Sequence, residues 1–214
     1  MTRKANKDEL LKYIKNLFNG NDIMFIYYCG SDSYKTRQEN SDTDVVVVLR
    51  DLKGVIHAAT DDVDIFAYGY EDYLARQSIT DTLPLYNLIH ADDVISIEDN
   101  IIFLDPLYEK EFDSIINLNF TDVLPQFLDA VLQYYNNLVL YEQVIVKRQY
   151  HIIRVRAILD NYLTTGKYSV LISEEWMEKL MYHKNNWSKL KDKEGHLDLL
   201  KQYLIEIKEI RDEI

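Results

Sequence analysis

The chain has 214 residues, of which 47% are hydrophobic, and a formal net charge of −12 at pH 7. This length suits one large domain or two small ones, and the hydrophobic content is sufficient for a packed core. The negative charge argues against a broad electrostatic contact with nucleic acid, and the single cysteine excludes a disulfide framework or a cysteine-rich zinc site.

The first half of the chain reads as a small α/β domain. Its opening residues, MTRKANKDELLKY, lack the apolar core of a signal peptide, so we expect a cytoplasmic protein. No apolar run is long enough to span a bilayer, so we expect no membrane contact. Apolar residues at helical spacing predict a first helix over residues 6–18. Short apolar runs predict strands over residues 22–28, 43–50 and 63–68. The loop 30–40 and a connection over 51–60 separate these strands. Helices are expected at 70–77 and 83–89, and two short strands on either side of residues 98–100.

From residue 106 onward the pattern is helical almost throughout. We expect long helices over 121–142 and 149–165, the second ended by Gly166. A third helix starts after Ser173, and a last one covers 196–210. The sequence therefore predicts an α+β fold, with a mixed-sheet domain over 1–105 and an all-helical domain over 106–214.

Three aspartates mark the most informative part of the sequence. Asp42 and Asp44 share one face at the start of a strand, because side chains at i and i+2 of a strand point the same way. Asp64, on the following strand, completes the group if the two strands lie side by side. Asp62 is a rival, because it occupies the same face, and we prefer Asp64 because it lies deeper in the apolar pattern. Such a group of carboxylates favours Mg²⁺ or Mn²⁺, which also binds substrate phosphates.

Gly30 and Ser31 follow the first strand directly. Glycine allows a ligand to approach the backbone closely, and serine offers a hydroxyl and an N–H group to a phosphate. A phosphate contact followed by a carboxylate metal site points to phosphoryl-type transfer.

The stretch GSDSYKTRQENSDTDVVVV resembles the signature of the nucleotidyltransferase fold, the DNA polymerase β superfamily. Within that superfamily it is most similar to the RNA-repair-associated branch and related phage proteins. Lys35 stands where that branch usually has glycine, which suggests a differently shaped loop, and Asp32 stands where an arginine is common. The matching positions are Gly30, Ser31, Ser41, Asp42 and Asp44, with Asp64 as the third carboxylate.

The segment KRQYHIIRVRAILDNYLTTGKYSV is similar to a helix of the same branch. Lys147, His151 and Arg154 fall at helical spacing and form one stripe. The alternatives are a cationic stripe that contacts the triphosphate and an ordinary solvated face. Arg156 lies on a different face, and we interpret it as structural or solvent-exposed. We interpret none of the scattered histidines, His57 among them, as a ligand.

The resemblance implies a metal-dependent transfer of a nucleoside monophosphate from an NTP to a hydroxyl, with release of pyrophosphate. Asp42, Asp44 and Asp64 would be the catalytic, metal-binding residues, with Gly30, Ser31 and Ser41 at the nucleotide. The acceptor is open between an RNA end, a protein hydroxyl and a small molecule. An alternative function is a nucleotide-binding interaction module that docks to a partner protein, as an antitoxin or an inhibitor does.

Overall fold

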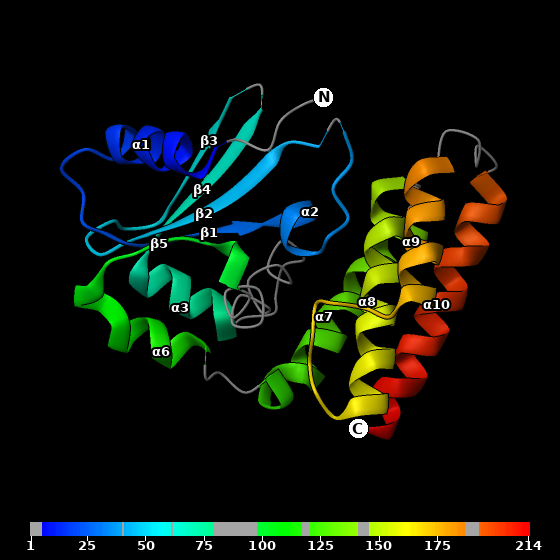
Figure 1. The fold of residues 1–214 in the computed structure, drawn as a ribbon. Coiled ribbons are helices and arrows are strands. Elements are labelled where there is room, and N and C mark those ends of the chain that lie inside the picture. Colours follow the sequence, from blue (N-terminus) through cyan, green and yellow to red (C-terminus); the bar gives the residue numbers. More distant parts are fainter. Residues whose placement is uncertain are drawn as a thin grey trace. The chain divides into compact units, whose positions relative to one another are not determined.

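The computed structural model describes residues 6–39, 41–60, 62–78, 98–116, 120–140, 146–186 and 193–214. These residues form two compact units, one with the described residues up to 116 and one with those from 120 onward. The first contains a five-stranded mixed sheet and the second is helical, so the predicted α+β class is confirmed (Figure 1). The first unit extends past residue 105, because the helix that follows packs on the sheet.

The sheet has the strand order β3-β4-β2-β1-β5. Neighbouring β2 and β4 are parallel, and the other neighbours are antiparallel. The strands predicted over 22–28, 43–50 and 63–68 and after residue 100 are present, and the segment expected as a plain connection over 51–60 contains an additional edge strand, β3. β2 carries the valine run and is central, so both of its faces are covered, as β-branched residues favour. The strands are β1 (Ile23–Cys29), β2 (Thr43–Leu49), β3 (Val55–Ala59), β4 (Val63–Gly69) and β5 (Ile101–Leu104).

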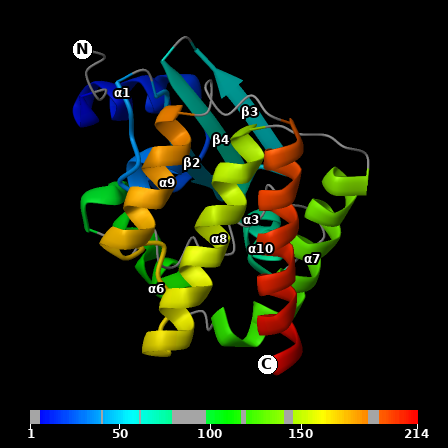
Figure 2. The same cartoon turned by 90° about the vertical axis from the view of Figure 1, so that its right-hand side faces the viewer.

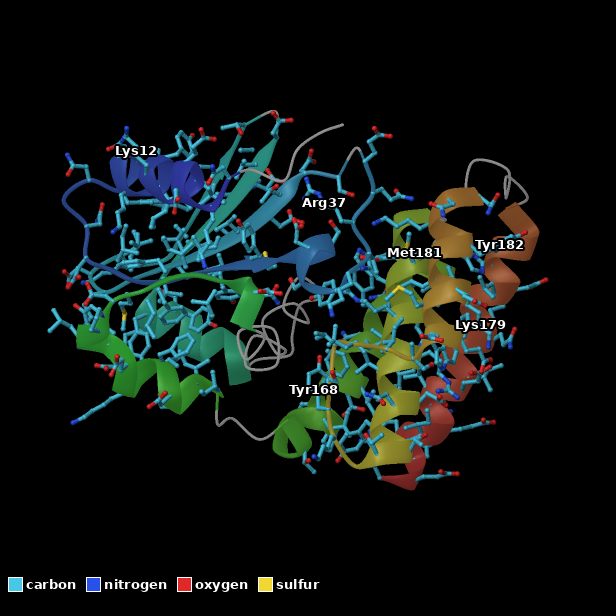
Figure 3. All side chains as sticks on the ribbon, in the orientation of Figure 1. Lys12, Arg37, Tyr168, Lys179, Met181 and Tyr182 are labelled. Carbon is cyan, nitrogen blue, oxygen red and sulfur yellow. The ribbon has the colours of Figure 1, made fainter. Side chains whose placement is uncertain are left out.

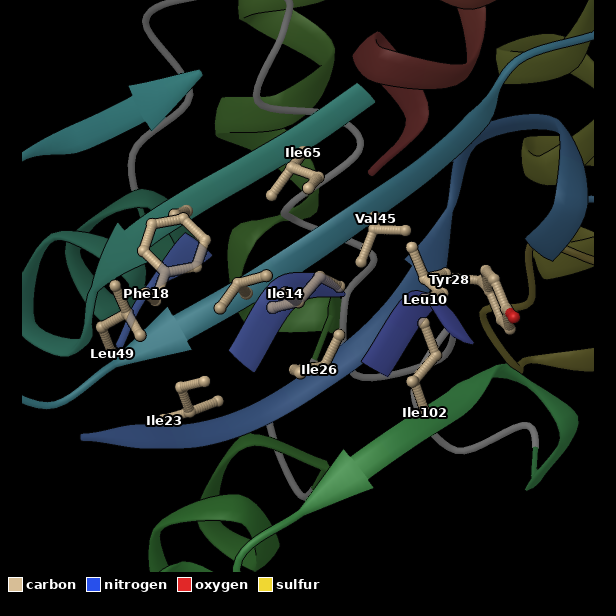
Figure 4. Close-up of a cluster of buried hydrophobic side chains, with 12 residues drawn as sticks. Leu10, Ile14, Phe18, Ile23, Ile26, Tyr28, Val45, Leu49, Ile65 and Ile102 are labelled. Atoms are coloured by element: carbon tan, nitrogen blue, oxygen red, sulfur yellow. The ribbon is translucent and has the colours of Figure 1, made fainter. Parts of the chain in front are cut away.

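Helix α1 (Lys7–Leu17) covers one face of the sheet. The Asn6 side chain caps it by accepting a hydrogen bond from the Asp8 N–H at 3.0 Å. Apolar residues of α1 pack on those of the central strands, for example Ile14 on the face that carries Val45 and Ile65 (Figure 4). This cluster forms the main core of the unit.

Helices α3 (Tyr70–Ser78) and α6 (Glu109–Ile116) lie on the opposite face (Figure 1). The Phe25 ring makes edge contacts with Tyr73 at 5.6 Å and with Phe112 at 5.4 Å, measured between ring centroids. Two short 3-10 helices, η2 (Glu98–Asn100) and η3 (Pro106–Tyr108), flank β5. The helix predicted at 83–89 and the strand predicted before residue 98 fall outside the described residues.

The second unit consists of long helices, and α8 packs against α9 and α10 while α10 packs against α7 (Figure 2). Gly166, at φ +68°, ends α8 and donates its N–H to the Tyr162 carbonyl at 2.7 Å, as predicted. Ser173 caps the next helix through its Oγ, which accepts from the Trp176 N–H at 3.4 Å. No helix among the described residues is long and apolar enough to cross a membrane. The helices are α7 (Phe120–Leu140), α8 (Val146–Thr165), α9 (Glu174–Asn186) and α10 (Lys193–Glu213).

Candidate active site

Two of the predicted carboxylates occupy one row across the sheet. Asp44 of β2 is the register partner of Cys29 in β1 and of Asp64 in β4. Residues directly opposite each other on neighbouring strands project from the same face. That face is the one away from α1. The next residues along the two strands, Val45 and Ile65, point to the other face, where they belong to the core under α1. The structure therefore brings Asp44 and Asp64 together, at the ends of the strands where β2 and β4 begin.

Gly30 lies directly against the Asp44 carboxylate. It adopts φ +62°, and a Cβ atom at this position would lie 2.0 Å from Asp44 Oδ2. Only glycine leaves room for the carboxylate and adopts this backbone conformation without strain. The next residue, Ser31, belongs to the one-turn helix α2 (Gly30–Ser33), and its carbonyl accepts a hydrogen bond from the Thr36 N–H at 3.0 Å.

The Cys29 thiol shows that negative charge gathers in this part of the sheet. Burial is the largest cause that raises the pKa of this thiol well above its ordinary value, followed by the carboxylates of Asp44, Asp32 and Asp64. All three carboxylates are thus close enough to disfavour a thiolate. Cys29 itself lies in the core, at 8% exposure.

Asp42, Ser41 and Asp62 precede the strands rather than lie within them. Asp42 is exposed. The Ser41 Oγ accepts a hydrogen bond from the Gln38 N–H at 2.9 Å, which closes a turn of the loop. Asp62 is also exposed, and its carbonyl accepts from the Thr43 N–H at 2.9 Å. Within the ranges that the structure describes, no three His, Cys, Asp or Glu side chains lie close enough to hold a metal ion between them.

His57, which the sequence analysis set aside, contacts this row. Its Nε2 lies 3.5 Å from Asp64 Oδ1, and its ring stacks on Phe66 with centroids 4.6 Å apart and planes at 5°. The side chain comes from β3, the strand that sequence reasoning missed. VIHAA is short, its residues are mostly exposed, and it lacks the alternation of apolar and polar residues that marks a strand. Only the pairing of β3 with β4 shows that His57 is a neighbour of Asp64.

Lys35 and Asp32, the two positions that depart from the family pattern, have surroundings that the sequence did not predict. Lys35 adopts φ +55°, which is the left-handed conformation that glycine takes without strain. The differently shaped loop that Lys35 suggested stays a prediction. Asp32 forms an ion pair with Arg37, with 2.6 Å between Oδ2 and the guanidinium Nη1, so its charge is offset locally. The sequence offered no specific signal for Arg37, since an isolated loop arginine is common.

The helical stripe lies in α8. Arg154 is buried, at 2% exposure, and its guanidinium carbon lies 6.0 Å from the centroid of the Tyr150 ring. Arg154 therefore does not lie on a solvated face of α8. His151 is half-buried and makes an edge contact with the same ring at 5.3 Å. Lys147 belongs to α8, and its side chain lies outside the described part of the chain.

Arg156 has a structural environment, as one of the two interpretations predicted. Its Nε donates to Glu206 Oε2 at 2.8 Å, which ties α8 to α10. A second, longer contact of 3.4 Å joins its Nη1 to Asp160 Oδ1. A part in nucleotide binding for Lys147, His151 and Arg154 stays a prediction.

Comparison with known proteins gives a weak structural likeness. No family model matches the chain, and no curated protein matches it. The chain is similar to the crystal structure of a nucleotidyltransferase-like protein from Exiguobacterium sibiricum 255-15. The two are 14% identical with a TM-score of 0.37, and the match covers 94% of this chain and 73% of that chain.

Proposed function

We propose that this protein transfers a nucleoside monophosphate from an NTP to a hydroxyl acceptor and releases pyrophosphate. The observation that carries the proposal is the in-register pairing of Asp44 with Asp64, with Gly30 packed against the Asp44 carboxylate. Two carboxylates held side by side repel each other unless a cation or a proton intervenes. The motif that contains these residues resembles the nucleotidyltransferase signature, and it supports the same reaction.

The residues fit a hard divalent cation such as Mg²⁺ or Mn²⁺. Carboxylate oxygens are the ligands that these ions prefer, and Asp44 and Asp64 present them from one row. Asp42 would complete the set, because its exposed side chain can change rotamer at low cost. When bound, the cation would supply positive charge that offsets the charge of the phosphates.

The other residues of the site would hold the nucleotide and move a proton. Gly30 and Ser31 would bind phosphate oxygens through backbone N–H groups and the serine hydroxyl. Ser41 would keep the loop closed through its hydrogen bond with Gln38. Asp64 would accept the proton of the attacking hydroxyl, since a carboxylate within hydrogen-bond reach is a suitable general base. Lys147, His151 and Arg154 are proposed to contact the triphosphate.

The acceptor belongs to one of three classes, namely an RNA end, a protein hydroxyl or a small molecule. The net charge of −12 disfavours a long nucleic acid held by electrostatic attraction alone. We propose that the protein acts in the cytoplasm. Incubation with each labelled NTP, Mg²⁺ or Mn²⁺, and either total RNA or cell lysate would show which fraction takes up the label.

Ligand binding is the first test of the proposal. A ligand that binds only the folded state at a hundredfold excess over its dissociation constant adds about 2.7 kcal/mol of stability. We therefore expect the melting temperature to rise with Mg²⁺ and one of the four NTPs. A melting temperature that no combination of NTP with Mg²⁺ or Mn²⁺ changes would contradict the enzyme. Stabilisation by an NTP without any transfer of label would instead favour the alternative, a nucleotide-binding module that docks to a partner protein.

Carboxylate variants test the assigned roles. Asp42→Asn, Asp44→Asn and Asp64→Asn should each abolish transfer and leave the fold intact, because amides remove charge without changing shape. Asp62→Asn is the matched control and should retain most of the activity, since Asp64 and not Asp62 is the partner of Asp44. An inactive Asp62→Asn beside an active Asp64→Asn would show that the third carboxylate is wrongly assigned.

A further inference from the structure

Arg37 lies in the loop between α2 and β2 (Figure 3), and its guanidinium contacts both ends of that loop. At the α2 end its Nη1 donates to Asp32 Oδ2 at 2.6 Å. At the β2 end its Nη2 donates to the Ser41 carbonyl at 2.8 Å. Nη1 also lies 3.3 Å from the Asp42 carbonyl and 3.3 Å from Thr43 Oγ1. A single guanidinium thus contacts four acceptors from both sides of the loop.

These contacts connect the two parts of the proposed site. Asp32 follows Gly30 and Ser31, the proposed phosphate contact, in the same short helix. Ser41 and Asp42 lead into β2 and Asp44. Because Arg37 forms hydrogen bonds with both segments, it fixes the distance between Gly30–Ser31, the proposed phosphate contact, and Asp42, the first carboxylate.

Arg37 also offsets a buried charge beside the carboxylate row. The Asp32 side chain is only 4% exposed, and that of Arg37 is 21% exposed. An ion pair this poorly hydrated is costly to break, because the remaining carboxylate keeps its charge without solvent. Asp32 shares its surroundings with Asp44 and Asp64, since all three carboxylates raise the pKa of the Cys29 thiol. Loss of Arg37 would therefore add negative charge where the phosphates are to bind.

We propose that Arg37 is a positioning residue for the transfer, which holds the Gly30–Ser31 turn and the Asp42 segment in one arrangement and offsets Asp32. This inference rests on the proposed function. The geometry requires arginine, because a planar guanidinium donates from several nitrogens in fixed directions and an ammonium group does not. Lysine at this position retains the charge but not the two-sided contact.

Hydrogen exchange tests the loop contact without any nucleotide. The N–H of Thr36 donates to the Ser31 carbonyl, and the N–H of Ser41 donates to the Gln38 carbonyl, each at 3.0 Å. In Arg37→Ala both amides should exchange faster than in the wild type, and amides of β1 should not change. Arg50→Ala is the matched control, since it makes the same charge change at the other end of β2, about 23 Å away at 3.3 Å per residue. Unchanged exchange at both amides in Arg37→Ala would overturn the inference.

Nucleotide titration below the melting temperature of each variant tests positioning. We expect Arg37→Ala to weaken the binding of Mg²⁺ and NTP by about 10- to 100-fold, the range usual for residues that support a metal site. Arg37→Lys should fall between Arg37→Ala and the wild type, and Arg50→Ala should bind as the wild type does. Equal binding by Arg37→Ala and Arg50→Ala would overturn the inference even if Arg37→Ala is less stable. Faster exchange in Arg37→Ala, together with a wild type that binds no NTP, would refute the proposed function and leave the loop contact standing.

Discussion

The contact between Gly30 and Asp44 makes a quantitative prediction about Gly30→Ala. The new Cβ atom would lie 2.0 Å from Asp44 Oδ2 and 2.8 Å from Asp44 Cγ, whereas ordinary contact begins at 3.4 Å. The carboxylate would have to move by about 1.4 Å, the difference between 3.4 and 2.0 Å. Forced displacement of this kind costs about 1–3 kcal/mol. Alanine at φ +62° adds about 1–2 kcal/mol of backbone strain. The total loss in free energy of unfolding should be about 2–5 kcal/mol.

Gly166→Ala separates the two contributions. Gly166 has φ +68°, close to that of Gly30, and nothing lies within 4 Å of an added Cβ. This control should therefore lose only the strain energy, about 1–2 kcal/mol. Urea unfolding curves of the two variants measure both losses on one scale.

A double variant identifies Asp44 as the obstacle. Gly30→Ala combined with Asp44→Ala removes the two closest atoms and leaves the Asp44 Cβ, the third closest, at 3.0 Å. The double-mutant cycle should give a coupling energy of about 1–3 kcal/mol. Equal losses in Gly30→Ala and Gly166→Ala, with no coupling to Asp44→Ala, would refute the placement of the carboxylate against Gly30.

Three further predictions concern other parts of the chain. Lys35→Gly should raise the free energy of unfolding by about 1 kcal/mol in urea unfolding curves, because it relieves left-handed strain at φ +55°. Lys53→Gly is the control: Lys53 has no positive φ, so this variant should be destabilised instead. The Cys29 thiol should stay unreactive toward a thiol reagent at pH 8 in the folded protein. Because the pKa of this thiol is raised in the folded protein, the stability that the thiol contributes is present below about pH 9 and is lost as the pH rises through the folded pKa. Cys29→Ala should remove this pH dependence from the unfolding curves. Arg154→Ala should weaken NTP binding more than Arg156→Ala does, by about 1.5–3 kcal/mol, since an arginine–phosphate bond is charge-assisted. Equal affinities of these two variants in a nucleotide titration would show that the stripe of Lys147, His151 and Arg154 takes no part in nucleotide binding.

The sequence by itself determined the local elements and the part of the chain that carries the chemistry. The valine run specified a strand buried on both faces, and Asn6, Gly166 and Ser173 specified helix ends through their own hydrogen bonds. The Gly30–Ser31 turn and the spacing of Asp42 and Asp44 could also be recognised from the sequence, because each involves residues that are close together in the chain. Each of these features depends on residues within a few positions of one another.

The tertiary structure alone decided which distant residues meet. Asp64 lies opposite Asp44 only because β2 and β4 pair in one register, and a shift by one residue would turn either side chain to the other face. His57 reaches Asp64 because β3 adds to the sheet edge, although its sequence has no strand pattern. The left-handed backbone of Lys35 and the four contacts of Arg37 depend on the folded loop in the same way. Pairing between strands is set by the packing of the whole core, which a local pattern of residues does not encode.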